Sequence, residues 1–199
     1  EVKYMEENKL KISPFGIALS VFLGIALFIL IVPFFGAWRM VGAGKVGVVT
    51  RFGAVQRVAN PGFVLKIPVI EGMTIMETRT QKEQVEAAAA SKDLQEVKST
   101  IALNYHLRGE KAVNVYQSIG PDYKIRVVDP AIQEAFKAST ARFTAEELIT
   151  KREAVKQEAL GHLRIRLARF YIVVDDFNIV NFDFSPEFNS AIEQKVKAQ

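Results

Sequence analysis

The side chains with the greatest capacity for chemistry in this sequence are two histidines and one pair of adjacent aspartates. His106 lies on the polar side of an expected strand, and His162 lies beside the apolar stripe of an expected helix. Neither has a second histidine or a carboxylate at a spacing typical of metal ligands. Asp175 and Asp176 are neighbours in an expected strand, which points their side chains to opposite faces. These residues therefore predict neither a catalytic site nor a metal site.

A second candidate is a glycine pattern. Gly42, Gly44 and Gly47 match the letters of the dinucleotide-binding motif G-x-G-x-x-G. In that motif a strand precedes the glycines and a helix follows, so that the pyrophosphate lies on the helix N-terminus. Here an expected helix precedes and an expected strand follows, so we interpret the glycines as a flexible linker. The sequence has no G-x-S-x-G motif and no cysteine, and we predict no catalytic residue, cofactor or metal.

The charge of the chain is modest and dispersed. The formal net charge is +4, from 26 basic and 22 acidic residues. No basic tract is interleaved with aromatic residues, so nucleic acid is not an expected partner.

The elements that must position any functional surface begin with an apolar stretch, residues 12–38, which carries no charged side chain. As a helix, Phe15–Phe35 would measure about 30 Å, the thickness of a bilayer hydrocarbon core. An aromatic belt at the membrane interface is expected at Phe34, Phe35 and Trp38. We predict a retained transmembrane helix, because the apolar region of a signal peptide is typically only about 7–15 residues long. Basic residues are balanced on the two sides, so they do not predict the topology.

Small residues recur at every fourth position of this stretch, at Gly16, Ser20 and Gly24. Such a face lets a second membrane helix pack closely, and we predict lateral helix packing there. The alternative is chance, because glycine and serine are common in membrane helices.

Strand patterns follow the apolar stretch. Val46–Phe52 and Ala54–Val58 predict a hairpin, and a turn at residues 60–62 leads to a strand over Phe63–Ile67. The clearest strand is Val97–Leu107, whose alternating pattern indicates a sheet with one buried face. Three apolar side chains near the linker are expected chiefly in the core, with insertion into the outer leaflet as the alternative: Phe52, Phe63 and Ile67.

From residue 110 the apolar period becomes helical. Asp129 is predicted as the N-cap of a helix that runs toward Ala141. Thr144 and Glu147 fit a capping box that opens one long helix to Phe170. Its apolar stripe consists of Val155, Ala159, Leu163, Leu167 and Phe170.

A strand over Tyr171–Phe184 is expected next, and Ser185-Pro186-Glu187 predicts the start of a last helix. This pattern runs to Gln199 without a stop signal, so we expect the helix to continue as a coiled coil in a longer protein. The predicted oligomerisation contacts are Val155, Leu163, Leu167, Phe188, Ile192 and Val196.

Several segments together resemble one known superfamily. They are Val46-Gly-Val-Val-Thr-Arg-Phe-Gly53, Asn60-Pro-Gly-Phe-Val-Leu-Lys-Ile-Pro68, Ser91-Lys-Asp-Leu-Gln95, Ser118-Ile-Gly-Pro-Asp-Tyr123, Ala141-Arg-Phe-Thr-Ala-Glu-Glu-Leu-Ile-Thr-Lys-Arg-Glu153 and Phe184-Ser-Pro-Glu-Phe188. The chain resembles the SPFH superfamily of stomatins, prohibitins, flotillins and HflK/HflC proteins, and is most similar to the prohibitins. Its long, uniformly apolar anchor departs from mitochondrial prohibitins and favours a bacterial relative.

The resemblance implies an α+β fold. The expected organisation is an N-terminal tail (1–11), a transmembrane helix (12–38), a β-rich SPFH1 subdomain (39–109), a mixed helical SPFH2 subdomain (110–184) and the start of a C-terminal helix (185–199).

The resemblance also implies a function without catalysis. Such proteins form large rings or cages on a membrane, enclose a membrane microdomain, and associate with a membrane AAA protease of the FtsH type. The expected partners are therefore further copies of the chain, or a homologous second subunit, together with lipids and such a protease. The expected location is a bacterial inner membrane, with the main domain on the non-cytoplasmic side. The alternative is a tethered binding or adaptor domain that acts as a monomer or small oligomer.

Overall fold

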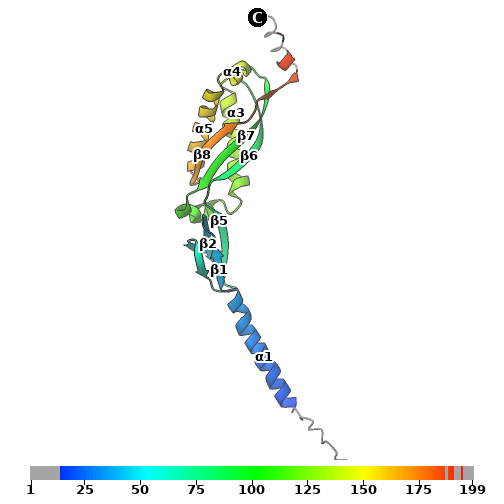
Figure 1. Ribbon diagram of the computed structural model, residues 1–199, viewed down its shortest axis with the longest axis vertical. Helices are drawn as coiled ribbons and strands as arrows, with labels where there is room; N and C mark the ends of the chain where they lie inside the picture. Colours follow the sequence, from blue (N-terminus) through cyan, green and yellow to red (C-terminus); the bar gives the residue numbers. More distant parts are fainter. Residues whose placement is uncertain (1–13, 187, 191–193, 195–199) are drawn as a thin grey trace, which may run out of the picture.

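The computed structural model describes residues 14–186, 188–190 and 194, and within the first helix it describes the side chains of residues 15–29 and 31. The molecule is elongated, with a helix at one end, a small lobe of strands next to it and a larger lobe beyond (Figure 1). Strands dominate the first part of the folded chain and helices the second, so the predicted α+β class is confirmed.

The elements follow one another in this order: α1 (Pro14–Phe35), β1 (Trp38–Val41), β2 (Lys45–Arg51), β3 (Ala54–Ala59), β4 (Gly62–Leu65), β5 (Glu71–Glu77), β6 (Gln81–Ala90), β7 (Glu96–Leu107), the 3-10 turn η1 (Gly109–Lys111), α2 (Ala112–Ser118), the π-helical turn η2 (Lys124–Val128), α3 (Asp129–Thr140), α4 (Ala145–Thr150), α5 (Arg152–Ala168), β8 (Ile172–Ile179) and β9 (Asp183–Phe184).

Helix α1 exposes every side chain that is described in it. It ends at Phe35, and Trp38 begins strand β1 instead of closing the helix, so the predicted limit at residue 38 is too late. Among the residues whose side chains are described, no helix combines the length and the apolarity needed to cross a membrane. The predicted transmembrane helix is therefore not confirmed by the structure.

The small lobe contains two antiparallel sheets. One has the order β3-β2-β5, and the other pairs β1 with β4. The predicted hairpin is confirmed, because β2 and β3 pair across the turn at Phe52-Gly53. The two sheets bury a small apolar cluster between them, formed by Val41, Val49, Ala59 and Val64.

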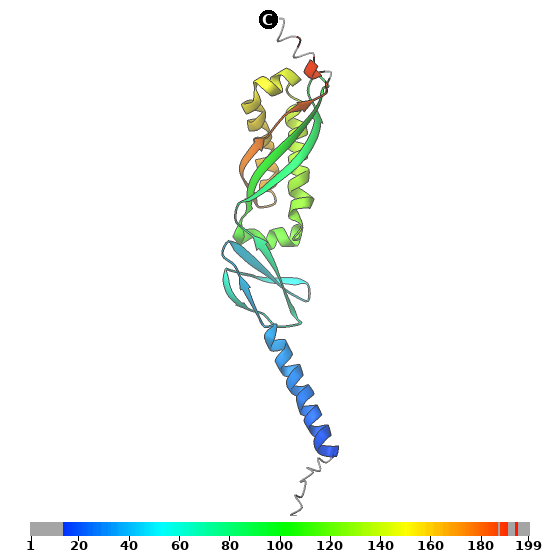
Figure 2. The ribbon, with the colours of Figure 1, turned by 45° about the vertical axis from the view of Figure 1, so that its right-hand side comes forward.

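The larger lobe is one antiparallel sheet covered by helices on one face. Strand β7 is central, with β6 on one side and both β8 and β9 on the other. Helices α3 and α5 cover one face of this sheet and leave the other without a helical layer from the described chain (Figure 2). The predicted limit between the two subdomains lies at residues 109 and 110. Strands β6 and β7 come before it and β8 after it, yet all three form one hydrogen-bonded sheet. The subdomain limit therefore stays a prediction.

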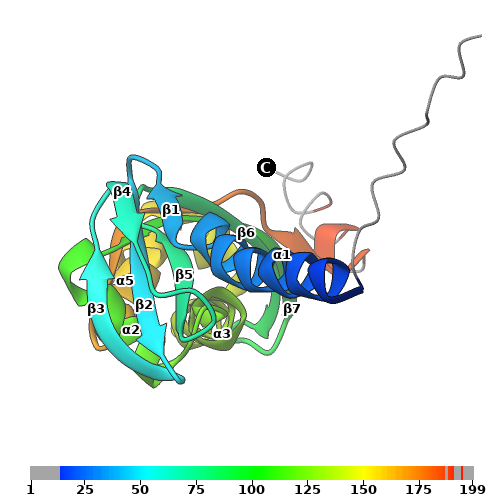
Figure 3. The same cartoon turned by 90° about the horizontal axis from the view of Figure 1, so that it is seen from below.

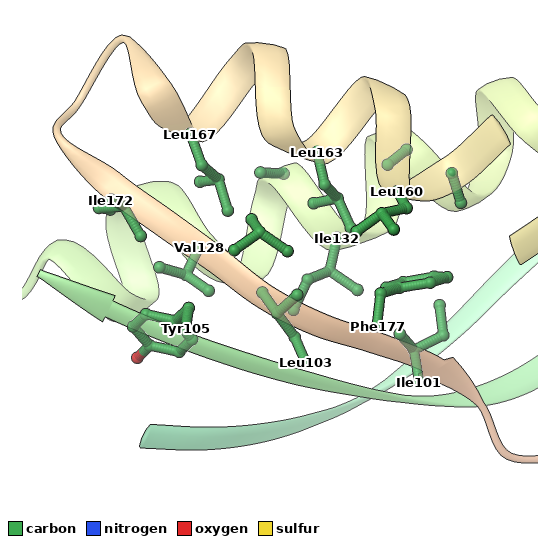
Figure 4. Packing of buried hydrophobic residues seen from close by; sticks show 14 of the residues in the cluster. Ile101, Leu103, Tyr105, Val128, Ile132, Leu160, Leu163, Leu167, Ile172 and Phe177 are labelled. Atoms are coloured by element: carbon green, nitrogen blue, oxygen red, sulfur yellow. The ribbon is translucent and has the colours of Figure 1, made fainter. Parts of the chain in front are cut away.

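The alternation predicted for Val97–Leu107 is confirmed by β7. Its inward side chains have almost no exposed surface: Val97, Ser99, Ile101, Leu103, Tyr105 and Leu107. Opposite them lie the apolar side chains of α3 and α5, among them Ile132, Leu163 and Leu167 (Figure 4). This layer between sheet and helices is the main core, and Val46, Val48 and Met76 of the small lobe extend it.

The predicted helix is present as α3, which begins at Asp129, but the predicted N-cap role of Asp129 is wrong. Val128, before Asp129, already has helical angles (φ −67°, ψ −53°), because the π-helical turn η2 leads directly into α3. Asp129 therefore lies inside the helical stretch. Its Oδ1 atom is buried without a hydrogen bond among the described residues, and this burial raises the pKa of the carboxyl group.

The long helix predicted from residue 145 to Phe170 is divided. The backbone leaves helical geometry at Lys151 (φ −113°, ψ 34°), between α4 and α5. The apolar stripe nevertheless continues across the division, since Leu148 and Val155 are both fully buried. Side-chain periodicity alone does not reveal such a kink, because the same face stays turned to the core.

The capping box at the start of α4 is confirmed. Thr144 Oγ1 accepts a hydrogen bond from the Glu147 N–H at 3.2 Å, and Glu147 Oε2 accepts one from the Thr144 N–H at 3.1 Å. Asp93 Oδ1 accepts a third bond from the Ala145 N–H at 2.9 Å. All three bonds satisfy N–H groups that a helix start leaves without an internal partner.

Thr144→Ala is expected to lower the free energy of unfolding by about 1 kcal/mol, because the N–H of Glu147 loses its acceptor. Urea unfolding followed by circular dichroism measures this. Thr150→Ala is the control, since that exposed hydroxyl only donates to Glu146 O within the same helix, and its effect should stay within about 0.5 kcal/mol. Equal losses in the two variants would contradict a capping role.

Candidate functional site

The polar side chains singled out by the sequence form one unexpected contact. His106 Nδ1 lies 2.9 Å from both carboxylate oxygens of Asp175, on neighbouring strands β7 and β8. Thr80 Oγ1 donates to Asp175 Oδ2 at 2.9 Å. In a nucleophilic triad the hydroxyl is bonded to the imidazole, which takes its proton. Here the carboxylate holds the hydroxyl instead, so the cluster joins the β5–β6 connection to β8 and activates no nucleophile.

The other polar candidates are dispersed. Asp176 turns away from Asp175 and lies 3.5 Å from Lys156 Nζ, as adjacent strand residues should. His162 Nε2 contacts Glu158 Oε1 at 3.3 Å, one helical turn away. Across the part of the chain that the structure describes, no three His, Asp or Glu side chains converge on a common metal position.

The glycine pattern lies in the small lobe. Gly44, with a φ of +76°, is in the turn between β1 and β2, and Gly47 lies within β2. A Cβ atom at Gly47 would come within 3.1 Å of Met73 Sδ and 3.3 Å of Ala59 Cβ. No helix starts at these glycines, so they present no site for a pyrophosphate. The interpretation of all three as a flexible linker is also wrong, because Gly47 is part of a packed sheet, and Gly42 and Gly44 lie in the short turn between two of the strands.

Exposed apolar side chains gather instead on the small lobe. Figure 3 shows that α1 leaves this lobe beside strand β1. Trp38 lies opposite Leu65, and Met40 opposite Phe63, so these side chains share one face of the β1–β4 sheet. With two neighbouring loops they form what we call the α1-proximal surface: Trp38, Met40, Phe52, Phe63, Leu65, Ile67 and Val69.

This arrangement corrects the prediction for three of the residues. Phe52, Phe63 and Ile67 are expected chiefly in the core, but they are 84%, 63% and 44% exposed. Soluble monomers rarely expose a contiguous group of large apolar side chains, and such a group typically marks contact with a membrane or another protein. The α1-proximal surface is therefore the best candidate for a functional site.

Two loop tips of this surface are held outward by an unusual backbone. Val69 is 99% exposed and has a φ of 67°, and Phe52 has a φ of 49°. A positive φ is a marked outlier for a β-branched residue such as valine. The Phe52 N–H donates to Ile70 O at 3.2 Å, so the two tips lie side by side. Strain of this kind persists only where surrounding contacts impose it.

Glu71 supplies those contacts. Its side chain is only 4% exposed; Oε2 accepts from the Ile67 N–H at 2.9 Å, and Oε1 accepts from Arg51 Nη2 at 2.8 Å. Arg57 Nη2 lies 3.6 Å from Oε2. The bond from the Ile67 N–H, followed by the bond from Arg51, holds the pKa of the Glu71 carboxyl below its usual value. The ionised carboxylate thus fixes the loop that carries Ile67 and Val69.

Glu71→Gln is expected to flatten the acid dependence of stability. A carboxyl whose pKa is lowered by folding stabilises the protein above its unfolded pKa, and the stabilisation is lost as the pH falls through the folded pKa. The thermal midpoint of the wild type should therefore fall more steeply between pH 5 and pH 3, roughly the range of carboxyl titration. Glu96→Gln, which removes an exposed partner of Lys98, is the control. Parallel pH profiles for wild type and Glu71→Gln would contradict the role of Glu71.

The residues predicted for helix packing in a membrane lie on α1. Gly16, Ser20 and Gly24 share one face, Ser20 Oγ donates to Ile17 O at 2.9 Å, and a Cβ atom at Gly24 would meet nothing within 4 Å. The backbone of Phe34 and Phe35 belongs to the helix, while their side chains lie outside the described ones. The Trp38 ring contacts that of Phe63 edge to face, with the centroids 6.1 Å apart.

The predicted oligomerisation contacts separate into two groups. Val155, Leu163 and Leu167 have no exposed surface and pack inside the core of the same chain. A side chain without exposed surface does not contact a second subunit while the domain is folded, so these three belong to the fold. Phe188 is half-buried, with its ring 5.0 Å from that of Phe184. Ile192 and Val196 lie outside the described residues.

Comparison with known proteins gives a consistent result. Residues 39–199 match the family model described as SPFH domain / Band 7 family. Prohibitin 1 of Mus musculus is 34% identical over 190 residues, which cover 94% of this chain and 67% of that protein. The mitochondrial prohibitin complex protein 1 of Caenorhabditis elegans is 34% identical over 185 residues, 92% of this chain and 65% of that protein. Prohibitin-1 of Colletotrichum higginsianum is 35% identical over 147 residues, 74% of this chain and 54% of that protein. The chain thus spans about half to two thirds of the length of these relatives.

Proposed function

Because this chain belongs to the SPFH domain / Band 7 family and has prohibitins among its relatives, we propose that it is a membrane-anchored scaffold. Its copies assemble side by side into a large ring or cage, and the assembly encloses a patch of membrane. The observation that carries the membrane part of this proposal is the α1-proximal surface, whose exposed apolar side chains lie on β1, on β4 and on two neighbouring loops, close to the end of α1.

Helix α1 is the proposed anchor. Its 22 residues correspond to about 33 Å of helix, close to the thickness of a bilayer core. It contains no Asp, Glu, Lys or Arg, and its described side chains are all exposed. Exposed apolar surface is unfavourable in water by about 25 cal/mol for each Å², and a bilayer removes that penalty. Gly16, Ser20 and Gly24 would then face the anchor of a neighbouring copy.

Lateral assembly is supported by the shape of the larger lobe. Among the described residues, helices cover only one face of its sheet, and the other face presents mostly short or polar side chains to the surroundings, among them Ala88, Thr100 and Ala102. On the helical side, Ile149 of α4 is exposed. A sheet face without a helical layer and an exposed apolar residue on a helix both suit contacts between copies. The last helix, with Phe188, Ile192 and Val196, is proposed as a further contact between copies.

The proposed role of the assembly is organisation rather than catalysis. By enclosing a membrane microdomain it would restrict the access of a membrane AAA protease of the FtsH type to its substrates, with a homologous second subunit as a further candidate partner. The length and apolarity of α1 favour a bacterial inner membrane in this proposal. The placement of the folded part on the non-cytoplasmic side is proposed from the family resemblance alone. Co-purification of such a protease with the full-length protein tests this partnership, and its absence from the purified assembly would remove this part of the proposal.

Contact between the α1-proximal surface and the bilayer has a direct test, because the chain contains no cysteine. A single nitroxide label is attached at Val69→Cys or at Leu94→Cys in the full-length protein, reconstituted in vesicles. Leu94 is a matched control, since it is 86% exposed and has a φ of 61°, but lies in the β6–β7 turn of the larger lobe. The label is exposed to two paramagnetic agents that collide with it: oxygen, which dissolves in the bilayer, and a nickel complex, which stays in water.

We expect the label at Val69 to collide more often with oxygen and the label at Leu94 more often with the nickel complex, as measured by power-saturation electron paramagnetic resonance. The reason is that an exposed valine at the membrane surface inserts among apolar chains. If both labels respond as water-exposed sites, the α1-proximal surface does not enter the membrane.

A further inference from the structure

A cavity of about 660 Å³ lies where α1 gives way to strand β1. It is lined by Gly36, Trp38, Arg39, Met40, Phe63 and Lys66. Its volume lies within the range of about 300–1,000 Å³ that is usual for sites of small molecules. The cavity includes part of the α1-proximal surface and adds two cations to it.

The two cations lack acidic partners. Neither Arg39 nor Lys66 forms an ion pair within the described residues. Lys66 Nζ has only a long bond of 3.4 Å to the backbone carbonyl of Glu71. The carboxylate of Glu71 is occupied by Arg51 and the Ile67 N–H. None of the described residues that line the cavity is acidic, so this wall carries an uncompensated positive charge that favours an anionic ligand.

The remaining wall is aromatic and apolar. The Trp38 and Phe63 rings lie edge to face, 6.1 Å apart, and Met40 is 78% exposed beside them. A site with cations on one side and large apolar side chains on the other suits an amphipathic anion. A small soluble anion would use the cations but leave the apolar wall in water.

The position of the cavity agrees with such a ligand. Helix α1 ends at Phe35 and the lining begins at Gly36. With α1 in the bilayer, the cavity therefore lies at the level of the lipid headgroups, where tryptophan is enriched in membrane proteins.

We propose that this cavity binds the phosphate-bearing headgroup of an anionic phospholipid, with Arg39 and Lys66 on the phosphate and with Trp38, Met40 and Phe63 along the first part of the acyl chains. This inference rests on the proposed membrane anchoring. It assigns to the scaffold a preference for a lipid class, so that each copy collects anionic lipid at the rim of the enclosed membrane.

Trp38 is the only tryptophan of the chain, and its fluorescence therefore reports on this cavity alone. The full-length protein is reconstituted in phosphatidylcholine vesicles that contain a small, equal fraction of lipid with brominated acyl chains. The brominated lipid is phosphatidylglycerol in one sample and phosphatidylcholine in the other. Bromine quenches tryptophan only at short range, so quenching measures how often each lipid occupies the cavity.

We expect stronger quenching by brominated phosphatidylglycerol than by brominated phosphatidylcholine. Each of the two cations should raise the occupancy ratio of the two lipids by about fivefold. The preference should disappear in Arg39→Gln/Lys66→Gln and persist in Lys98→Gln, which removes an exposed cation on β7. Arg39 is exposed and Lys66 half-buried, so circular dichroism should show the double variant folded as the wild type. A preference that survives in the double variant overturns the proposal.

Two further outcomes distinguish failure of the headgroup site from failure of the membrane anchor. Equal quenching by both lipids overturns the headgroup site and leaves the membrane anchor in place. Absence of quenching by either lipid overturns the anchoring together with the site. Inorganic phosphate is added in a third arm, at constant ionic strength set with chloride. Loss of the lipid preference in that arm would identify the site as one for free phosphate and overturn the lipid assignment.

Discussion

Leu163→Ala is expected to lower the free energy of unfolding by about 2–5 kcal/mol, the range for removing a leucine side chain from a packed core. Leu163 has no exposed surface, and it points from α5 toward the sheet in the layer that contains Ile132 and Leu103 (Figure 4). The measurement is urea unfolding of the full-length protein in detergent, followed by far-ultraviolet circular dichroism. The loss should be the same at high and low protein concentration, because the contact lies within one chain.

Ile165→Ala is the matched control. Ile165 lies two residues further along α5 and is 74% exposed, so its truncation should change the free energy of unfolding by no more than about 0.5 kcal/mol. A different outcome would support Leu163 as a contact between copies. In that case Leu163→Ala would leave unfolding at low concentration unchanged and reduce the size of the particle.

The second large effect is expected for Leu23→Arg/Leu27→Arg in the middle of α1. Each substitution makes membrane insertion of the helix less favourable by about 3–4 kcal/mol, because a leucine that favours the bilayer centre is replaced by a charged residue. The two positions are one helical turn apart and both exposed, so the folded lobes should be unaffected. After expression, the variant should move largely from the carbonate-resistant membrane pellet to the supernatant.

The control for this variant is Ala154→Arg/Gln157→Arg, which places the same charges on the exposed side of α5. It should stay in the pellet as the wild type does. Retention of both variants in the pellet would mean that α1 is not the main anchor. Loss of both would mean that added charge, and not its place in α1, releases the protein.

Much of the fold follows from local patterns in the sequence. The strand β7 is predicted from strict alternation, and the capping box of α4 from two residue types three positions apart. The hairpin of β2 and β3 is predicted from two β-branched runs around Gly53. These features are set by residues that are close together in the chain, and their local sequence patterns are typical of a hairpin and a capping box.

Features that depend on distant contacts were not predictable in this way. Residues 106 and 175 are 69 positions apart, and their contact requires the β7–β8 register with its irregularity after Asn104. The helical backbone before Asp129 could not be predicted either, because an Asp-Pro pair is typical of a helix start and gives no sign of a preceding helical turn. The kink at Lys151 leaves no mark in the apolar stripe.

The α1-proximal surface illustrates the most important difference. Phe52 and Phe63 are large and apolar, and such residues are usually buried. Their burial nevertheless requires a facing layer, and the small lobe has none beyond its β1–β4 sheet among the described residues. Residue type therefore indicates that these side chains need a partner. Only the three-dimensional arrangement shows that no other part of the described chain covers them.

The proposed membrane scaffold consists of many copies of this chain. The most direct test is the mass of the full-length protein extracted in mild detergent, measured by light scattering with single-particle images of the same peak. We expect a ring or cage of megadalton order, with the α1 ends of all copies on one rim. A particle of one or two copies would contradict it and leave a tethered binding domain as the better description.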